Sequence, residues 1–322
     1  MGIADVNSQE VQKSFPGIRV HSSVGDLLDK RPDAVIIALP NQEHAKVGIE
    51  CARRGISFLM EKPVTDKMEA AMELIAAVKL SGVKTLVGHH RRHHTQVRIL
   101  RAQLASGELG NVLGVSAVWA ARKPNSYFAA APWRSASGGG PILINLVHEI
   151  DFLRFVLGEI VGVCGFASSR ERGFPVEDTV GTVLSFESGA VGSFLLTDSA
   201  VSPWTTEQGI GESVEFPFSG EGNYRFLGTM GSIEFPNLKI WTNGKGEGSW
   251  NEAVWSRKLH AVSLDPYEAQ LNHFHDVLVG QVPSLQPVED GALTLLATLA
   301  VAESAAKGAW IDLRPLTDRL RA

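Results

Sequence analysis

Residues 33–63 hold the stretch that decides the fold: DAVIIALPNQEH at 33–44 and, after a helical interval, ISFLMEKP at 56–63. The run at 33–39 is apolar, rich in β-branched residues and closed by Pro40, which is typical of a strand buried on both faces of a parallel sheet. Residues 43–55 carry apolar side chains at helical spacing and end in two arginines and a glycine, as an amphipathic helix does. With a second buried strand at 56–60, the stretch predicts a strand, a helix and a parallel strand with a right-handed crossover.

Polar residues follow both predicted strands. Pro40 and Asn41 close the first strand, and Glu61, Lys62 and Pro63 close the second. Because ligands of open parallel sheets bind beyond the carboxyl ends of the strands, these positions are candidate ligand contacts. A lysine between a carboxylate and a proline can be held and aimed into a cleft, although an exposed turn lysine is the simpler interpretation of the tripeptide alone.

Composition bounds the class of protein. The 322 residues are enough for two domains, and 44% hydrophobic residues are enough for a sizeable core. A formal charge of -5 gives no indication of a nucleic-acid or anionic-membrane surface. Two cysteines, Cys51 and Cys164, are too few for a disulfide framework or a zinc site. The first residues, MGIADVNSQE, have the pattern of neither a signal peptide nor a membrane span, so we expect a cytoplasmic protein.

Several further patterns follow in order along the chain. They are A-x-P-N-x-x-H (Ala38, Pro40, Asn41, His44), Glu61-Lys62-Pro63, Val87-Gly88 with Arg91-Arg92, and Gly138-Gly139-Gly140 leading to His148-Glu149-Ile150-Asp151. In these patterns and up to residues 305–313 the chain resembles the Gfo/Idh/MocA family, the nicotinamide-dependent oxidoreductases that include glucose-fructose oxidoreductase and inositol dehydrogenase. The resemblance covers essentially the whole chain. No single motif decides it; their order and spacing do.

Two domains are expected. Residues 1–110 read as a Rossmann-like α/β domain, a doubly wound parallel sheet. Residues 111–322 read as an α+β domain with a large, mostly antiparallel sheet, because short alternating runs separated by glycine turns are expected at 112–119, 179–186, 190–197, 224–227, 231–235 and 238–241. One face of that sheet is expected to be open, which indicates a homodimer or homotetramer. Helical periodicity returns at 266–278 and 290–307, and in the family these helices pack back towards the first domain.

The N-terminus lacks an expected feature. Residues 3–5 look like the end of a strand whose terminal carboxylate, Asp5, accepts hydrogen bonds from an adenosine ribose in dinucleotide-binding folds. In the family this is the second strand, yet no G-x-G-x-x-G precedes it. Either the reading frame starts too late or the protein has lost its phosphate-binding turn. We favour the late start, because loss of a central strand exposes both its neighbours, and we expect an empty slot between residues 1–5 and 33–39.

Four histidines surround two arginines at 89–94, in the order HHRRHH. This cluster favours a strand-end loop that faces the cleft over a metal site, because adjacent helical positions point about 100° apart and no suitably spaced carboxylate accompanies them. We therefore predict no metal. The resemblance implies that His90 contacts the ligand near the nicotinamide, while His93 and His94 are expected to be exposed to solvent.

The chemical centre of the second domain is the segment GGGPILINLVHEID at 138–151. Asn145, His148 and Asp151 follow one another at i, i+3 spacing, so they share one helix face. In the family a histidine here serves with the E-K-P lysine as acid-base machinery. The sequence departs from the family at Ile144, where many members carry an aspartate. His148 then acts with Lys62 alone, or Asp151 takes the orienting role, since Asn145 can hydrogen-bond but cannot act as a base.

The remaining candidate residues line the cofactor and the substrate. The first group is Asp5, Leu39, Pro40, Asn41, His44, Glu61, Lys62 and His90; the second is Lys62, Arg92, Tyr127, Trp133, Arg134, Asn145 and His148. Tyr127, Trp133 and Arg134 lie in a polar, aromatic loop that could stack on a polyhydroxylated ligand, and burial of the loop is the alternative for Trp133. Residues 202–215 form a second long loop that could act as a lid.

These patterns predict an NAD-dependent dehydrogenase, with NADP possible, that removes hydride from a secondary alcohol of a sugar, cyclitol or related polyol. Lys62 hydrogen-bonds the reacting oxygen and His148 takes the proton. Asp5 favours NAD, because a carboxylate repels a 2′-phosphate. Two alternatives stay open: a glycosidase that uses bound NAD for transient oxidation, and a ligand sensor or scaffold that keeps the fold without turnover. No nucleic-acid or membrane partner is expected.

Overall fold

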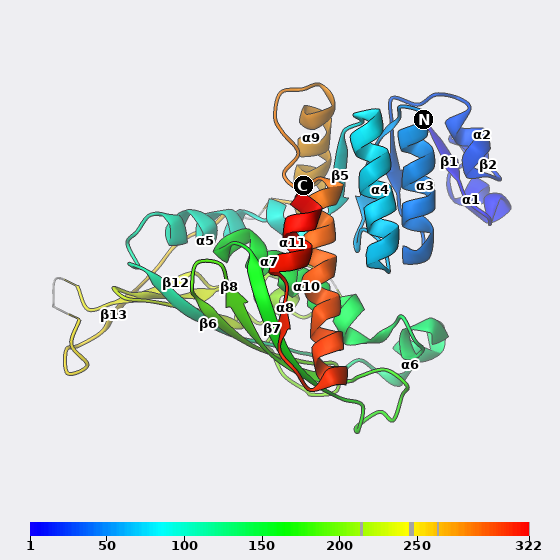
Figure 1. Cartoon of the computed structure of the whole chain (residues 1–322). Coiled ribbons are helices and arrows are strands. Elements are labelled where there is room, and N and C mark those ends of the chain that lie inside the picture. Colours follow the sequence, from blue (N-terminus) through cyan, green and yellow to red (C-terminus); the bar gives the residue numbers. More distant parts are fainter. Residues whose placement is uncertain (213–214, 245–247, 263, 322) are drawn as a thin grey trace. The chain divides into compact units, whose positions relative to one another are not determined.

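The computed structural model describes residues 1–212, 215–244, 248–262 and 264–321. The chain divides into two compact units (Figure 1). Unit 1 comprises Met1–His89 and Gln270–Leu295, and unit 2 comprises His90–Ala269 and Leu296–Ala322. The predicted domain boundary at residue 110 stays a prediction.

The stretch at 33–63 forms the predicted strand, helix and parallel strand. Ala34 pairs with Ser57 and Ile37 with Met60 in one register, and the next strand continues the parallel sheet. Lys67 is the N-cap of the helix that follows the second strand, and the Thr65 hydroxyl donates a hydrogen bond to the Asp66 carboxylate. The elements are β3 (Ala34–Ile37), α3 (Asn41–Arg53), β4 (Ser57–Glu61), α4 (Met68–Ser81) and β5 (Thr85–Gly88).

A separate two-stranded parallel sheet precedes them. It consists of β1 (Gly2–Ala4) and β2 (Arg19–His21), with α1 (Ser8–Ser14) and α2 (Val24–Leu28). In the described residues β1 pairs with β2 and β3 with β4, and the two sheets share no hydrogen-bonded strand pair. The expectation that β3 is buried on both faces is wrong at Ile36, which is 58% exposed, because β3 is an edge strand. The edges of β1 and β3 are therefore both open to a further strand.

Helix α9 (Pro266–Leu278) contributes to unit 1 through its last two turns. Phe274 forms a buried cluster with Leu59 and Leu86, and Leu278 packs against that cluster. The Lys84 ammonium donates to the Leu278 carbonyl at 2.8 Å and so fixes the end of the helix beside β5. The later C-terminal helix is α10 (Val288–Lys307).

Among the residues that the structure describes, the sheet of unit 2 has nine strands in the order β13-β12-β11-β10-β6-β9-β8-β7-β14. All neighbours are antiparallel except β6 and β9, which confirms the mostly antiparallel sheet. Of its strands, β7, β13 and β14 had no sequence prediction. The strands are β6 (Val112–Ala120), β7 (Ile160–Ser168), β8 (Thr179–Phe186), β9 (Val191–Thr197), β10 (Tyr224–Gly228), β11 (Ser232–Phe235), β12 (Lys239–Thr242), β13 (Trp255–Lys258) and β14 (Ile311–Asp312).

One face of this sheet is covered. Phe152, on a helix that crosses the sheet, packs at 4.8 Å between ring centroids against both Tyr224 and Phe235. The helical elements of unit 2, besides α10, are η1 (His90–His93), α5 (Thr95–Ala105), α6 (Asn125–Ala130), η2 (Pro132–Ser135), η3 (Ile142–Leu146), α7 (Val147–Leu157), α8 (Thr206–Ile210) and α11 (Arg314–Arg321). Within the described ranges, no helix combines the length and the apolar content that crossing a bilayer requires.

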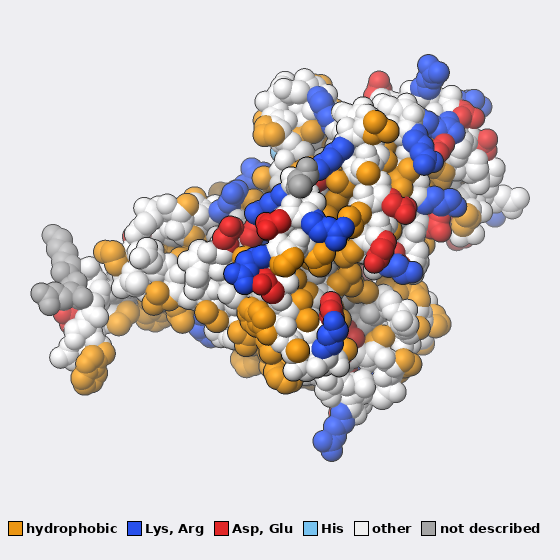
Figure 2. All heavy atoms as spheres, viewed as in Figure 1, with side chains coloured by type: hydrophobic (Ala, Val, Ile, Leu, Met, Phe, Trp, Pro, Cys, Tyr) orange, Lys and Arg blue, Asp and Glu red, His pale blue; other side chains and the backbone are white. Residues whose placement is uncertain are grey.

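The opposite face carries apolar side chains that remain accessible. Their exposed fractions are between 43% and 71%, and Figure 2 shows hydrophobic side chains gathered over the β7–β8 side of the sheet. The alternation along each strand explains this, because successive residues point to opposite faces. We call this set the outer face; it consists of Leu113, Phe166, Val183, Val191, Leu195 and Leu227.

Candidate functional site

His44 fixes the two strand-end loops of unit 1 to each other. Its Nδ1 lies 2.8 Å from the Pro63 carbonyl oxygen and its Nε2 lies 2.8 Å from the Leu39 carbonyl oxygen. The ring is fully buried on α3, one turn after Asn41. His44 thus joins the loop after β3 to the loop after β4, and its predicted role in cofactor binding stays a prediction.

Lys62 directly follows β4. The preceding Glu61 pairs in register with Gly88 of β5, and its carboxylate accepts a hydrogen bond from the Lys62 backbone N–H at 3.3 Å. The peptide bond between Lys62 and Pro63 is cis. Pro40 is the N-cap of α3 and Asn41 its first residue. The predicted positions of unit 1 therefore lie at the carboxyl ends of β3 and β4, where ligands of parallel sheets bind.

Asp5 follows β1. Its Oδ1 accepts a hydrogen bond from the Asn7 backbone N–H at 2.7 Å, in the turn that leads into α1. This turn contains Val6 and Asn7 and no glycine. A backbone that must approach a pyrophosphate closely needs glycine there, so the β1–α1 turn is not built as a phosphate cradle.

In unit 2, Arg91 is buried among three carboxylates. Its guanidinium nitrogens lie 2.5 Å from Glu149, 2.5 Å from Glu207 and 3.5 Å from Glu212. Burial would lower the pKa of Arg91, but these carboxylates raise it well above its ordinary value. Burial raises the pKa of Glu149 despite the neighbouring guanidinium, and Tyr224 donates a hydrogen bond to the same carboxylate. We call these four charged side chains, Arg91, Glu149, Glu207 and Glu212, the Arg91 cluster.

The loop at 202–215 supplies part of this cluster. Glu207 lies on α8, and Glu212 lies two residues after the end of that helix. Glu207 also accepts a hydrogen bond from the Trp119 indole N–H at 2.9 Å. Trp204 is 46% exposed. Residues 213 and 214 of the predicted lid lie outside the described residues. The described part of the loop is anchored by carboxylates, and its role as a lid stays a prediction.

His90 contacts several groups of unit 2. Its Nε2 is hydrogen-bonded to Glu212, its ring stacks on Tyr267 at 4.6 Å, and the His148 ring meets it edge-on at 5.7 Å. The expectation that His93 and His94 are exposed to solvent is wrong, since they are 4% and 1% exposed. Residues of η1 and the start of α5 turn inward here because the carboxylates of α7 and α8 attract the basic side chains of the segment.

Arg92 and Asp151 form a second buried ion pair. Arg92 Nε lies 3.0 Å from Asp151 Oδ2, and Nη2 lies 2.7 Å from Oδ1, so the guanidinium grips the carboxylate with two nitrogens. Both side chains are at most 6% exposed. The pair ties η1 to α7, one turn beyond His148. The substrate role of Arg92 and the orienting role of Asp151 stay predictions, and this pair gives both residues a structural role as well.

The three glycines at 138–140 have a local explanation. Gly138 and Gly140 have φ of 89° and 80°, which only glycine adopts readily. A Cβ on Gly139 would lie 2.5 Å from the Trp133 carbonyl oxygen. Glu177 then caps the following helix, since its carboxylate accepts from the Ile142 N–H at 2.8 Å. The glycines let this turn pack against the loop at 132–135; they do not form a phosphate site.

Asn145 lies in η3, a wide π-helical turn, and its Oδ1 accepts a hydrogen bond from the Lys123 ammonium at 2.6 Å. Lys123 was not among the predicted site residues. Its ammonium is also 3.9 Å from Asp198, and burial lowers the pKa of Lys123 to about 8 against the effect of that carboxylate. Perturbed buried lysines and π-helical turns are both found more often at functional sites than elsewhere. No motif marked Lys123, because its partners are 22 and 75 residues away in the sequence.

The Tyr127 ring of the aromatic loop receives two cation–π contacts. Lys123 lies 5.0 Å above the Tyr127 ring, and the Arg134 guanidinium lies 3.8 Å from the same ring. Arg134 also donates to the Tyr127 carbonyl at 2.8 Å. Trp133 is 54% exposed, so its side chain is not fully buried as a loop anchor. An aromatic ring flanked by cationic donors suits a polyhydroxylated ligand, because the ring can pack on an apolar face of the ligand while the cations donate hydrogen bonds to its oxygens.

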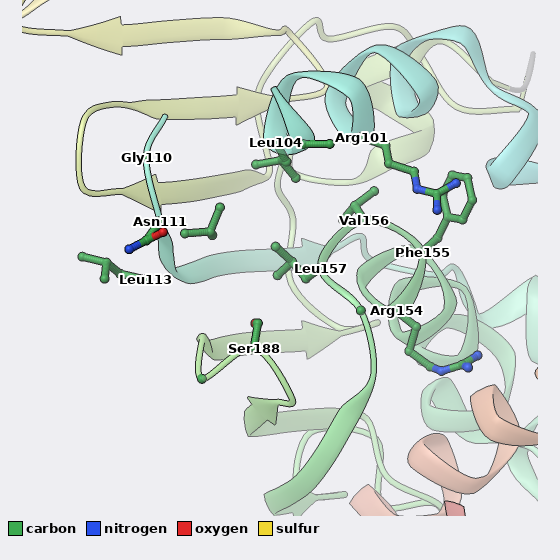
Figure 3. Close-up of a pocket in the computed structure, with 14 residues that line it drawn as sticks. Arg101, Leu104, Gly110, Asn111, Leu113, Arg154, Phe155, Val156, Leu157 and Ser188 are labelled. Carbon is green, nitrogen blue, oxygen red and sulfur yellow. The ribbon is translucent and has the colours of Figure 1, made fainter. Parts of the chain in front are cut away.

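A cavity of about 740 Å³ lies elsewhere in unit 2. Figure 3 shows it at the rim of the large sheet, where the Arg101 guanidinium meets the Phe155 ring at 4.3 Å and Ser188 lies on the β8–β9 turn. None of the candidate residues lines it. Its lining combines two arginines, Arg101 and Arg154, with the Phe155 ring and small or aliphatic residues, and it carries none of the acid-base groups described above.

Comparisons with known proteins agree with this arrangement. Residues 1–89 match the family model described as "Oxidoreductase family, NAD-binding Rossmann fold", and residues 97–234 match the GFO/IDH/MocA C-terminal domain. The chain is 29% identical over 292 residues to 1,5-anhydro-D-fructose reductase of Ensifer adhaerens, covering 89% of this chain and 82% of that one. It is 26% identical over 300 residues to scyllo-inositol 2-dehydrogenase (NAD(+)) of Bacillus subtilis strain 168, covering 89% and 79%.

Solved structures share the fold. Levoglucosan dehydrogenase, in complex with NADH and levoglucosan, superposes with a TM-score of 0.75 at 23% identity, over 96% of this chain and 89% of that one. The WlbA dehydrogenase from Bordetella pertussis, in complex with NADH and UDP-GlcNAcA, gives a TM-score of 0.76 at 23% identity, over 97% and 89%.

The chain combines a Rossmann-type parallel sheet with a large, mostly antiparallel sheet, and the two family models match these two parts. Together they define an NAD-binding oxidoreductase. The chain belongs to the Gfo/Idh/MocA family. The family and the overall fold class predicted from the sequence are thereby confirmed.

The described residues fit NAD in part. The carboxyl ends of β3 and β4, held together by His44, provide Asn41 and Lys62 for one half of a dinucleotide. The other half needs a glycine-rich turn for the pyrophosphate, and the turn after β1 has no glycine and an N–H already bonded to Asp5. Leu39, Pro40, Asn41 and Lys62 are therefore the residues of unit 1 best suited to hold the cofactor.

Proposed function

We propose that this protein transfers hydride between NAD and a secondary alcohol of a sugar, cyclitol or related polyol. The proposal is supported by relatives named as a reductase and a dehydrogenase of such compounds. The observation that carries it is the side-chain set of unit 2, in which Asn145, bonded to Lys123, lies one helical turn before His148. Amide, ammonium and imidazole groups together bind hydroxyls and accept a proton.

Two residues divide the chemistry in this proposal. His148 takes the hydroxyl proton as the carbon gives up its hydride, and the alcohol becomes a ketone. Lys62 hydrogen-bonds the reacting oxygen and stabilises the negative charge that develops on it. NAD supplies the hydride acceptor when it is bound. Asn145 and Lys123 position the neighbouring hydroxyls of the substrate, with Tyr127, Trp133 and Arg134 lining it, while His90 and Arg92 stay candidate contacts.

We further propose NAD rather than NADP as the preferred cofactor. Asp5 ends β1, where a carboxylate accepts hydrogen bonds from a ribose and repels a 2′-phosphate. Asp5→Ser, which removes the charge and keeps a small polar side chain, should weaken NAD binding and lessen the discrimination against NADP. An unchanged preference in this variant would rule out Asp5 as the selecting residue.

The test of the reaction is stoichiometric. The protein is incubated with NAD and a panel of cyclitols, anhydro sugars and hexoses, and NADH and the ketone are both quantified. Equal amounts of NADH and ketone are expected with at least one polyol. Release of an aglycone from a glycoside without net NADH would instead assign the protein to NAD-dependent glycosidases. A complete absence of turnover with tight polyol binding would favour the sensor.

We also propose that the outer face is buried in a homodimer or homotetramer. Its side chains, among them Phe166 at 71% exposure and Leu195 at 45%, form an apolar set that a monomer would leave in water. Light scattering of the purified protein should give a multiple of the chain mass. Leu195→Glu should shift the protein towards monomers, whereas Leu80→Glu, an exposed apolar position on α4, should not. A monomeric wild-type protein would refute the proposal.

A further inference from the structure

The group His90, His94 and Glu212 belongs to unit 2 and has a geometry of its own. One ligand atom from each residue lies within 4.8 Å of the others. His90 is hydrogen-bonded to Glu212 Oε1, and His94 Nε2 lies 3.6 Å from Glu212 Oε2. The three side chains are between 2% and 7% exposed. Two imidazoles and one carboxylate thus converge on a single point inside the protein.

The sequence argument against a metal rested on the missing carboxylate near the histidines. Glu212 supplies it from 118 residues further along the chain, at the end of the α8 segment. The histidines that converge on it are four residues apart, across the junction of η1 and α5, and not adjacent. His90 opens the 3-10 turn η1 and His94 is the extended N-cap of α5, and the turn between them brings both imidazoles to the Glu212 carboxylate.

His94 is the second observation that points to a ligand. Among the described residues, neither ring nitrogen of His94 has a hydrogen-bond partner, although the side chain is 2% exposed. The Glu212 Oε2 atom, which it approaches, also has none within the described part of the chain. A buried polar atom without a partner is costly, and such atoms facing each other mark a position for an ion or a proton.

The charge of the Arg91 cluster favours a cation at this position. Three carboxylates (−3) face one guanidinium (+1), which leaves −2; counting Lys123, which is electrostatically coupled to Glu207, still leaves −1. Glu212 belongs to this cluster and is also the carboxylate that His90 and His94 approach, so a cation between the three side chains would lie beside this negative charge. Arg91, 3.5 Å from Glu212 Oε2, would orient it from outside the ligand set.

We propose that His90, His94 and Glu212 bind one divalent transition-metal ion of the zinc or cobalt class. Imidazole nitrogens and a carboxylate oxygen are the ligands these ions prefer, whereas magnesium and calcium prefer oxygens alone. Three protein ligands leave a fourth position for water or a substrate oxygen. The site adjoins His148 through the His90 ring, 5.7 Å away. It is separate from the hydride-transfer proposal, because it is detected without NAD and without a polyol.

The test is a titration of the untagged, chelator-treated protein with Zn²⁺ by calorimetry and with Co²⁺ by visible absorption. One ion per chain is expected to bind. Glu212→Gln, which keeps shape and hydrogen bonding, and His94→Ala should each weaken binding at least tenfold, since even outer residues of metal sites contribute 10–100-fold. His275→Ala, at a histidine whose side chain is 70% exposed, is the matched control and should bind normally.

Folding is followed separately by thermal unfolding. Zn²⁺ at about 100 times its dissociation constant should raise the melting temperature of the wild-type protein and not that of Glu212→Gln, because the ion binds the folded state. If His94→Ala does not fold, Glu212→Gln decides alone. No binding of either ion, or binding that both variants leave unchanged, would overturn the proposal.

Discussion

Replacement of Lys123 by methionine tests the unexpected member of the candidate site. The Lys123 ammonium, with a side chain 12% exposed, is bonded to Asn145 and lies 3.9 Å from Asp198. Burial lowers the pKa of Lys123 from 10.5 to about 8. A shift of roughly 2.5 pH units at 1.36 kcal/mol per unit corresponds to about 3 kcal/mol of folding free energy. Methionine keeps the length of the side chain and removes the titration.

The direction follows from proton counting. Between pH 8 and about 10.5 the unfolded chain binds a proton at Lys123 that the folded protein does not, so the wild-type protein gains stability as the pH rises. Urea unfolding at several pH values should show wild type gaining up to about 3 kcal/mol over Lys123→Met across this window. Below pH 8 the two curves should run parallel, which serves as the internal control. Parallel curves up to pH 10.5 would refute the burial argument.

Two further predictions concern other parts of the molecule. Asp151→Asn removes the carboxylate charge that faces the Arg92 guanidinium, so it should lower the free energy of unfolding in urea by about 3–5 kcal/mol. The control Asp276→Asn, on the surface, should lower it by under about 0.5 kcal/mol. Equal losses in the two variants would contradict this prediction. His148→Ala should depress the rate most near neutral pH, and an unchanged pH–rate profile would show that the proton goes elsewhere.

Much of the fold follows from local patterns. The predicted strand at residues 179–186 and the helix at 266–278 agree with β8 and α9, because alternation and helical periodicity are properties of the segments themselves. The burial of Ile36 was predicted wrongly, since burial on both faces depends on which strands are neighbours and not on the strand itself. Strand β7 was not predicted from the sequence, because glycines at 162 and 165 interrupt its apolar pattern.

The candidate site was less accessible from the sequence. Lys62 and His148 carry motifs, so their positions could be named in advance, although their roles stay proposals. The Arg91 cluster and the Lys123–Asn145 bond join segments 22 to 121 residues apart, and no local spacing reveals such contacts. Histidines 93 and 94 looked exposed because their segment is polar. They are buried because the preceding Arg91 and Arg92 pair with carboxylates of α7 and α8, which holds the segment inside unit 2.

The central claim is that Lys62 stabilises the transition state of an NAD-dependent alcohol oxidation. The most direct measurement is kcat/KM for NADH formation by Lys62→Ala with the best polyol of the panel, at NAD concentrations above its dissociation constant. Lys67→Ala, an exposed lysine five residues on, is the matched control. We expect Lys62→Ala to lose at least about 100-fold, or about 3 kcal/mol of transition-state stabilisation, with the fold intact and Lys67→Ala unaffected. Near-normal activity of Lys62→Ala would contradict the account.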